Sequence, residues 1–113
     1  MTPVEAADRL FNRVMTAVSA ADSTEAQQFM PMAIGAYERA RPLNSDGLFH
    51  LSMLQRTAMQ FEAALATAEE ILEVNSAHLL GLSAAANAAI ELGRSDIAKT
   101  YYERVLEVYE SQI

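Results

Sequence analysis

The sequence predicts an all-α fold, and three observations support this class. Alanine, leucine, methionine and glutamate, which favour helices, dominate the chain, and no strand-like alternation appears. Apolar residues recur at helical spacing between short breaks. Segment 47–74 also matches segment 81–108 when the chain is shifted by 34 residues. We expect about six helices in three antiparallel pairs, because the connections between them are short.

The length and composition predict a single globular domain spanning residues 1–113. A chain of 113 residues is long enough to bury a core, and 51% of its residues are hydrophobic while 20% are charged. This balance favours a folded chain over a disordered one, because enough apolar surface can be buried to offset the entropy lost on ordering.

The first two helices are bounded by capping signals. Thr2, Pro3 and Glu5 form the pattern of a capping box with proline at the first helical position, so the first helix should run from there to about Ala20. Asp22 to Glu25 offer the next cap. Pro31 lies within the second helix and predicts a kink or an interruption there, and Pro42 should end this helix.

Four further helices follow in the second part of the chain. Asn44, Ser45 and Asp46 offer caps for a third helix that reaches about Thr57. The fourth should run from about Gln60 to Val74, with the stripe Phe61, Ala64, Leu65, Ala68, Ile71 and Leu72. Asn75–Ser76 forms the next turn, and Gly93 separates the fifth helix from the sixth.

The repeat carries small residues at matching positions, such as Gly47 with Gly81 and Ala64 with Ala98. A period of 34 residues with small residues where two helices cross resembles the tetratricopeptide repeat (TPR) family. The resemblance implies a short right-handed α-solenoid of helix pairs, with repeats at 45–78 and 79–112 and a degenerate repeat at 11–44, where Met30 replaces the expected alanine. An ordinary helical bundle is the alternative.

The resemblance also implies a site. In this family the first helices of successive repeats line a concave groove that binds a peptide or protein, so this chain is expected to act as an interaction module or adaptor. Carried over position by position, the groove residues are Asp46, Phe49, His50, Met53 and Arg56 in one repeat and Ser83, Asn87 and Glu91 in the next.

The alternative function is self-assembly through exposed helix faces. The last helix carries Tyr101, Val105 and Tyr109, with Ile113 beyond it, which is more apolar surface than one preceding helix pair can cover. We expect part of this edge to be exposed and to pair with a second copy.

The charge distribution argues against nucleic acid as a partner. The net charge is −7, and residues 62–110 hold nine acidic against three basic residues. Such a surface would repel phosphates rather than neutralise them. We interpret the acidic half mainly as a solvated face that keeps the protein soluble.

No catalytic, metal or cofactor site is expected. The only histidines, His50 and His78, lie 28 residues apart and no HExxH pattern accompanies them, so we expect structural or solvent-exposed roles for both. Glutamates such as Glu69, Glu70 and Glu73 should lie on a solvated helix face rather than in a cleft that shifts their pKa values. The sequence therefore favours a binding protein over an enzyme.

The compartment stays open. The chain has no cysteine, hence no disulfide framework. It shows neither a membrane span nor a signal peptide, because no run of about 18 apolar residues occurs and acids stand early in the sequence. A cytoplasmic location is slightly favoured, and a periplasmic one is the alternative if an upstream anchor precedes this chain.

Overall fold

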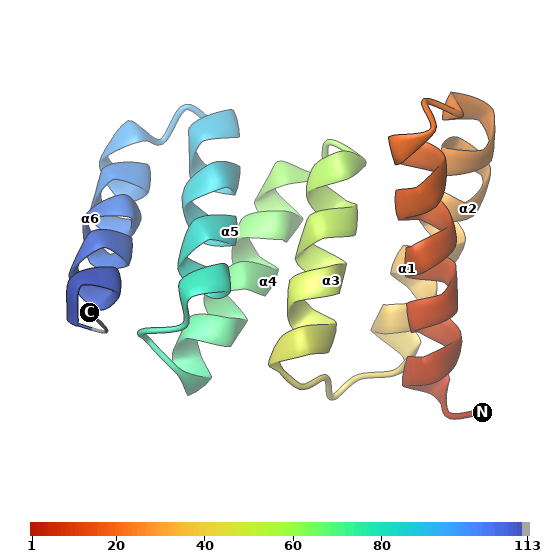
Figure 1. The fold of residues 1–113 in the computed structure, drawn as a ribbon, viewed down its shortest axis with the longest axis horizontal. Coiled ribbons are helices and arrows are strands. Elements are labelled where there is room, and N and C mark those ends of the chain that lie inside the picture. Colours follow the sequence, from red (N-terminus) through yellow and green to blue (C-terminus); the bar gives the residue numbers. More distant parts are fainter. Residues whose placement is uncertain (112–113) are drawn as a thin grey trace.

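The computed structural model describes residues 1–111, and within them it contains six α-helices and no strand (Figure 1). The helices are α1 Pro3–Ser19, α2 Ser23–Arg39, α3 Ser45–Thr57, α4 Phe61–Val74, α5 Leu79–Glu91 and α6 Ser95–Ser111. The predicted all-α class is confirmed. Ile113, which we placed beyond the apolar edge of the last helix, lies outside the described residues, as does the end of the predicted repeat 79–112.

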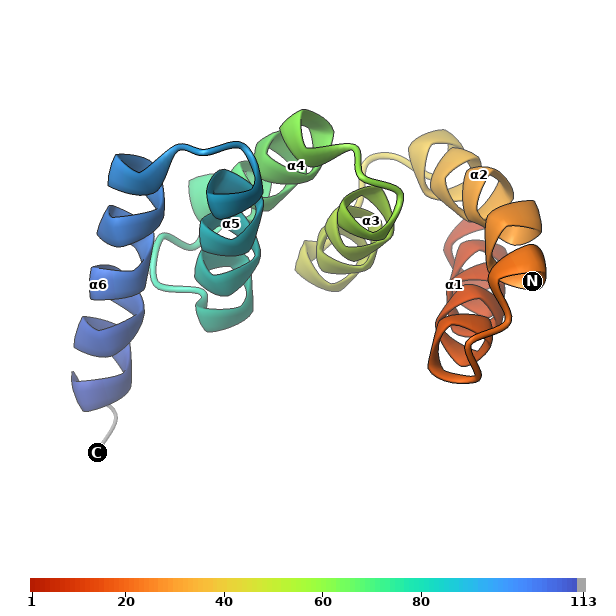
Figure 2. The same cartoon turned by 90° about the horizontal axis from the view of Figure 1, so that it is seen from above.

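Helices that follow one another in the chain pack against one another. Contacts are extensive between α1 and α2, α3 and α4, α4 and α5, and α5 and α6, but they are sparse between α2 and α3. In Figure 2 the helices follow an arc, with α1, α3 and α5 on its inner side and α2 and α4 on its outer side. Within residues 1–111, α1 does not contact α6, so the helices do not close into a bundle. The handedness of a solenoid remains a prediction.

Local capping explains where the helices begin. The Thr2 hydroxyl accepts a hydrogen bond from the Glu5 amide at 3.1 Å, and the Glu5 carboxylate accepts one from the Thr2 amide at 3.0 Å, which lowers the pKa of Glu5. Asp22 and Asn44 cap α2 and α3 in the predicted way. Nδ1 of His78 accepts from the Gly81 amide at 3.1 Å and caps α5, so this histidine has a structural role.

Three turns, one inside each helix pair, share one hydrogen-bonding pattern. In each, a backbone amide reaches five residues back and the residue before it has a positive φ: Ala21 (58°), Met59 (64°) and Gly93 (73°). This is the Schellman ending of a helix, in which the positive-φ position is normally glycine because a side chain strains the backbone there. Gly93 fits this rule, whereas Met59 departs from it.

The first helix pair departs from the 34-residue register. α3 begins at Ser45 and α5 at Leu79, and α4 begins at Phe61 and α6 at Ser95, so the second and third pairs are 34 residues apart. α2 begins at Ser23, 38 residues before α4, because it is about one helical turn longer than α4.

This extra turn corrects two sequence expectations. The predicted boundary of the repeat 11–44 falls inside α1, and Ala26, which is buried, takes the place that we had given to Met30. Pro31 also does not interrupt the helix, because α2 runs continuously through it.

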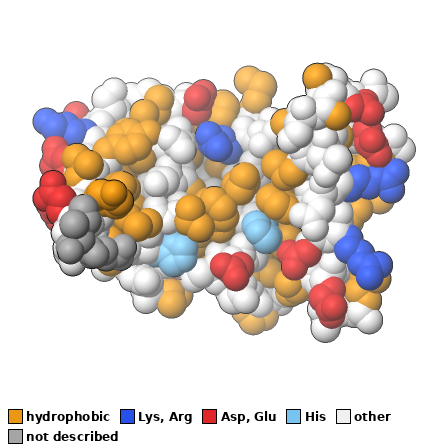
Figure 3. All heavy atoms as spheres, viewed as in Figure 1, with side chains coloured by type: hydrophobic (Ala, Val, Ile, Leu, Met, Phe, Trp, Pro, Cys, Tyr) orange, Lys and Arg blue, Asp and Glu red, His pale blue; other side chains and the backbone are white. Residues whose placement is uncertain are grey.

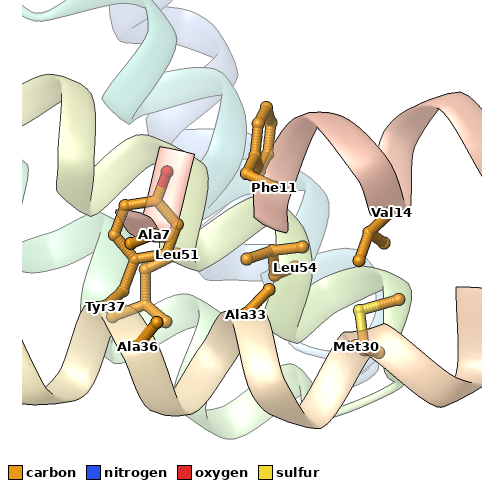
Figure 4. Packing of buried hydrophobic residues seen from close by; sticks show 9 residues of the cluster. All are labelled: Ala7, Phe11, Val14, Met30, Ala33, Ala36, Tyr37, Leu51 and Leu54. Carbon is orange, nitrogen blue, oxygen red and sulfur yellow. The ribbon is translucent and has the colours of Figure 1, made fainter. Parts of the chain in front are cut away.

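Two apolar clusters form the core. The first joins α1, α2 and α3, where Tyr37 and Leu51 are fully buried (Figure 4). The second joins α4 and α5 through small side chains such as Ala64 and Ala85. Ala64 is 0% and Ala98 is 3% exposed, which confirms the predicted burial of both alanines at the helix crossings. In residues 1–111 every buried side-chain nitrogen and oxygen has a hydrogen-bond partner.

Ion pairs connect segments that lie far apart in the sequence. Arg41, in the loop after α2, donates to Glu70 of α4 at 2.9 Å and to Glu38 at 3.2 Å. These two carboxylates, Glu70 first, raise the pKa of Arg41. Arg94 likewise pairs with Glu62 at 2.5 Å and holds the start of α6 near α4. Because all these groups are partly exposed, each pair contributes little stability but fixes the relative position of neighbouring helices.

Candidate functional site

The predicted binding surface lies on the inner side of the arc. Figure 3 views this side, and hydrophobic side chains gather on it between α3 and α5. The row predicted on α3 runs along the helix axis, with Asp46 exposed near its start and Arg56 exposed near its end. At a rise of about 1.5 Å per residue, these two charges stand roughly 15 Å apart.

Phe49 and Met53 lie between these charged ends and are only half-buried. Phe49 packs against the cluster of α4 and α5, and Met53 packs against the cluster of α1, α2 and α3. Each therefore stabilises a neighbouring helix pair while keeping part of its side chain open to solvent. This agrees with the expectation that Phe49 is not fully buried.

His50 belongs to a polar cluster that the sequence did not reveal. Its Nδ1 lies 3.0 Å from the Tyr37 hydroxyl and 3.3 Å from Oδ1 of Asp8, and its ring stacks on Phe11 at 4.2 Å. The Tyr37 hydroxyl itself donates to Asp8. Because these residues come from α1, α2 and α3, the cluster ties the first helix pair to the second. We assign His50 a structural role in addition to its place on the inner surface.

The predicted residues of α5 divide between two surroundings. Ser83 is half-buried, and the side-chain oxygen of Asn87 accepts a hydrogen bond from the Tyr102 hydroxyl of α6 at 2.8 Å. Asn87 therefore supports its own helix pair. Glu91 instead shares a shallow pocket of about 290 Å³ with Arg56, Thr57 and Phe61. The structure thus brings Arg56 and Glu91 together across the ends of α3 and α5.

The predicted self-association edge on α6 is only partly an edge. Tyr101 packs against the alanine cluster, and its hydroxyl donates to Glu69 of α4 at 2.6 Å, so it does not lie on an open face. Val105 is half-buried, and Tyr109 is 58% exposed. Leu106, which we did not name, is 60% exposed and lies with Ile90 and Tyr102 along a hollow on α6.

An apolar cleft of about 640 Å³ also escaped the sequence analysis. It lies where α2 faces the turn between α3 and α4, a junction that Figure 2 views from above. No charged side chain lines it; its walls are Val18, Ser23, Ala26, Gln27, Met30, Pro31, Ile34, Gly35, Thr57, Ala58, Met59 and Gln60. One sequence signal could have indicated it, namely a methionine at position 59, where the matching turn has Gly93.

Two further searches of the described residues gave negative results. Among residues 1–111, no group of three or more histidine, cysteine, aspartate or glutamate side chains could hold a metal ion. In the same part of the chain, no helix has the length and apolar character needed to cross a membrane. The features available for binding are thus the inner surface, the α6 face and the apolar cleft.

Comparison with known proteins identifies no relative. No protein-family model matches the chain, and no curated protein sequence matches it either.

Proposed function

We propose that this chain is a protein-protein interaction module of the TPR type, which docks a peptide or protein segment on the inner surface of α3 and α5. One observation carries the proposal: α3 presents two half-exposed apolar side chains, Phe49 and Met53, between two exposed charges of opposite sign, Asp46 and Arg56. An apolar centre with a polar rim is the usual anatomy of a protein interface.

The order of charges along α3 supports a particular partner. A basic group of the partner fits near Asp46, to which Asp8 adds a second carboxylate on the same side. An acidic group fits near Arg56, whose guanidinium has no ion-pair partner among the described residues. Such complementarity fixes the direction in which a segment lies on the surface.

Charge reversal at Arg56 tests this proposal. Peptides that bind the folded chain are first selected from a displayed library and are then titrated against Arg56→Glu and against Lys99→Glu. Lys99 is a matched control, because it is also exposed but lies on the outer part of α6. We expect Arg56→Glu to weaken the selected peptides about tenfold or more and Lys99→Glu to leave them unchanged. Equal affinities for both variants, or a library that gives no binder, would contradict the proposal.

Self-association through α6 is a second candidate function, supported by the exposed side chains of Leu106 and Tyr109. Exposed apolar side chains on one helix face favour association when they are contiguous. Sedimentation over a range of concentrations tests it: the candidate predicts a dimer at micromolar concentration that becomes monomeric in the double variant Leu106→Ser with Tyr109→Ser. A monomer at all concentrations rules this function out.

A further inference from the structure

The apolar cleft lies on a face of α2 whose counterpart on α4 is covered by another helix. Aligning the two helices at their N-caps, Asp22 and Gln60, sets the side chains in correspondence. The cleft residues Ala26, Gln27, Met30 and Ile34 then correspond to Ala64, Leu65, Ala68 and Leu72. In α4 these four residues pack in the second core cluster.

The helix that covers this face of α4 is α5. It contributes Ala84, Ala85 and Ala88 to the same cluster, and their small side chains allow the two helices to lie close together. α3 does not do the same for α2, because the contacts between α2 and α3 are sparse. The molecule itself therefore indicates what fits the open face of α2, namely a helix with small, uncharged side chains.

Met59 supplies a second and independent observation. It stands at a positive φ of 64° where the matching turn has glycine, and its side chain is 73% exposed at the wall of the cleft. A bulky residue at such a φ costs stability, and an exposed methionine gains nothing by burial in the free protein. Methionine is flexible and polarisable, which suits a surface that adapts to a bound apolar partner.

The charge of the cleft narrows the chemistry of that partner. The twelve lining residues include no ionisable group, and their only polar side chains are Ser23, Gln27, Thr57 and Gln60. Arg39 lies beside one end, with its guanidinium over Gly35. A charged side chain pressed into the apolar walls would lose its hydration without gaining a partner. The contact stripe of the ligand must therefore be uncharged.

We propose that the apolar cleft binds an α-helix of a partner protein, through a stripe of alanine- and leucine-sized side chains spaced by three and four residues. The site is separate from the inner surface, since α2 and the turn after α3 form it and neither Arg56 nor Glu91 lines it. Met59 closes over the bound helix from the side of the turn.

The probe is a fluorescent helical peptide that copies the α5 stripe of Ala84, Ala85 and Ala88 and carries lysine and glutamate at its other positions. It is titrated against the full chain and against Met59→Gly. Because glycine relieves the positive φ, this variant should unfold a few degrees higher than the parent chain, while its affinity for the peptide falls about tenfold. A loss of binding with a gain of stability cannot result from unfolding.

Ala21→Gly is the matched control, because Ala21 also has a positive φ but does not line the cleft. It should raise the unfolding temperature and leave the affinity unchanged. Equal affinities for Met59→Gly and the parent chain overturn the proposal, as does a peptide that does not bind. Weaker binding to Arg56→Glu alone would place the peptide on the inner surface instead. A dimer of the chain that Met59→Gly dissociates would make a second copy the occupant and exclude the foreign helix.

Discussion

The hydroxyl of Tyr37 donates a hydrogen bond to the carboxylate of Asp8 and so joins α2 to α1. The Tyr37 ring is fully buried, and its hydroxyl also lies 3.0 Å from Nδ1 of His50 on α3. Burial first, and the nearby Asp8 carboxylate second, raise the pKa of Tyr37. Three helices therefore depend on one hydroxyl group for their relative position.

Removal of this hydroxyl should loosen the first helix pair. We expect Tyr37→Phe to lower the free energy of unfolding by about 1–2 kcal/mol, because Asp8 and His50 lose a partner while remaining partly solvated. Tyr109→Phe is the control, since Tyr109 is exposed and should change stability very little. Urea denaturation of the three proteins measures the difference. Equal stability of all three would show that the cluster contributes nothing.

Two glycines at the same position of two helices should respond in opposite ways to alanine. A Cβ at Gly81 would lie 2.8 Å from Cγ2 of Ile71, a core side chain of α4 that is fully buried. A Cβ at Gly47 would meet only the Leu43 side chain, at 3.3 Å. Gly81→Ala should therefore destabilise the chain by about 1–2 kcal/mol, whereas Gly47→Ala should leave it unchanged or stabilise it by up to about 1 kcal/mol. Thermal unfolding compares the two, and a stabilising Gly81→Ala would refute the close approach of α5 to α4.

The helices and their caps could be predicted from the sequence because local signals determine them. Thr2, Asp22 and Asn44 each lie a few residues from the amides that they cap, and Ala64 and Ala98 follow the repeat. The longer α2 could not be predicted in this way, because its extra turn has no counterpart in the other pairs.

The candidate sites were predicted less completely than the fold. Side chains of three helices form the His50 cluster, and the apolar cleft depends on how loosely α2 meets α3. Both are tertiary features that no local pattern specifies. Tyr101 was wrongly placed on an open edge for the same reason, since only the tertiary structure brings Glu69 to its hydroxyl.

A larger side chain at a helix crossing should separate the crossing helices. Ala98 is almost completely buried where α6 packs against α5, so Ala98→Leu should cost about 1–3 kcal/mol of stability through overpacking. Ala66, an exposed alanine of α4, provides the control substitution Ala66→Leu. Both variants are compared by chemical denaturation. A loss no larger at position 98 than at position 66 would argue against the repeat register.

The stability of the chain should fall at high pH, partly through Tyr101. Burial, followed by the hydrogen bond to Glu69, raises the pKa of Tyr101 from 10.0 to about 12. The unfolded chain therefore loses this proton first, so the contribution is complete below pH 10 and is lost as the pH rises towards 12. Tyr101→Phe should remove this part of the decline, which denaturation at several pH values measures. An identical decline in the variant would show that Tyr101 titrates normally.

The most direct test of the proposed interaction module is to map a selected peptide on the isotope-labelled chain by nuclear magnetic resonance. Binding on the inner surface predicts that the largest shift changes fall on Phe49, Met53 and Arg56 of α3 and on Glu91 of α5, and that Arg56→Glu abolishes them. Changes confined to the outer faces of α4 and α6, with α3 and α5 unaffected, would contradict the inner surface as the docking site.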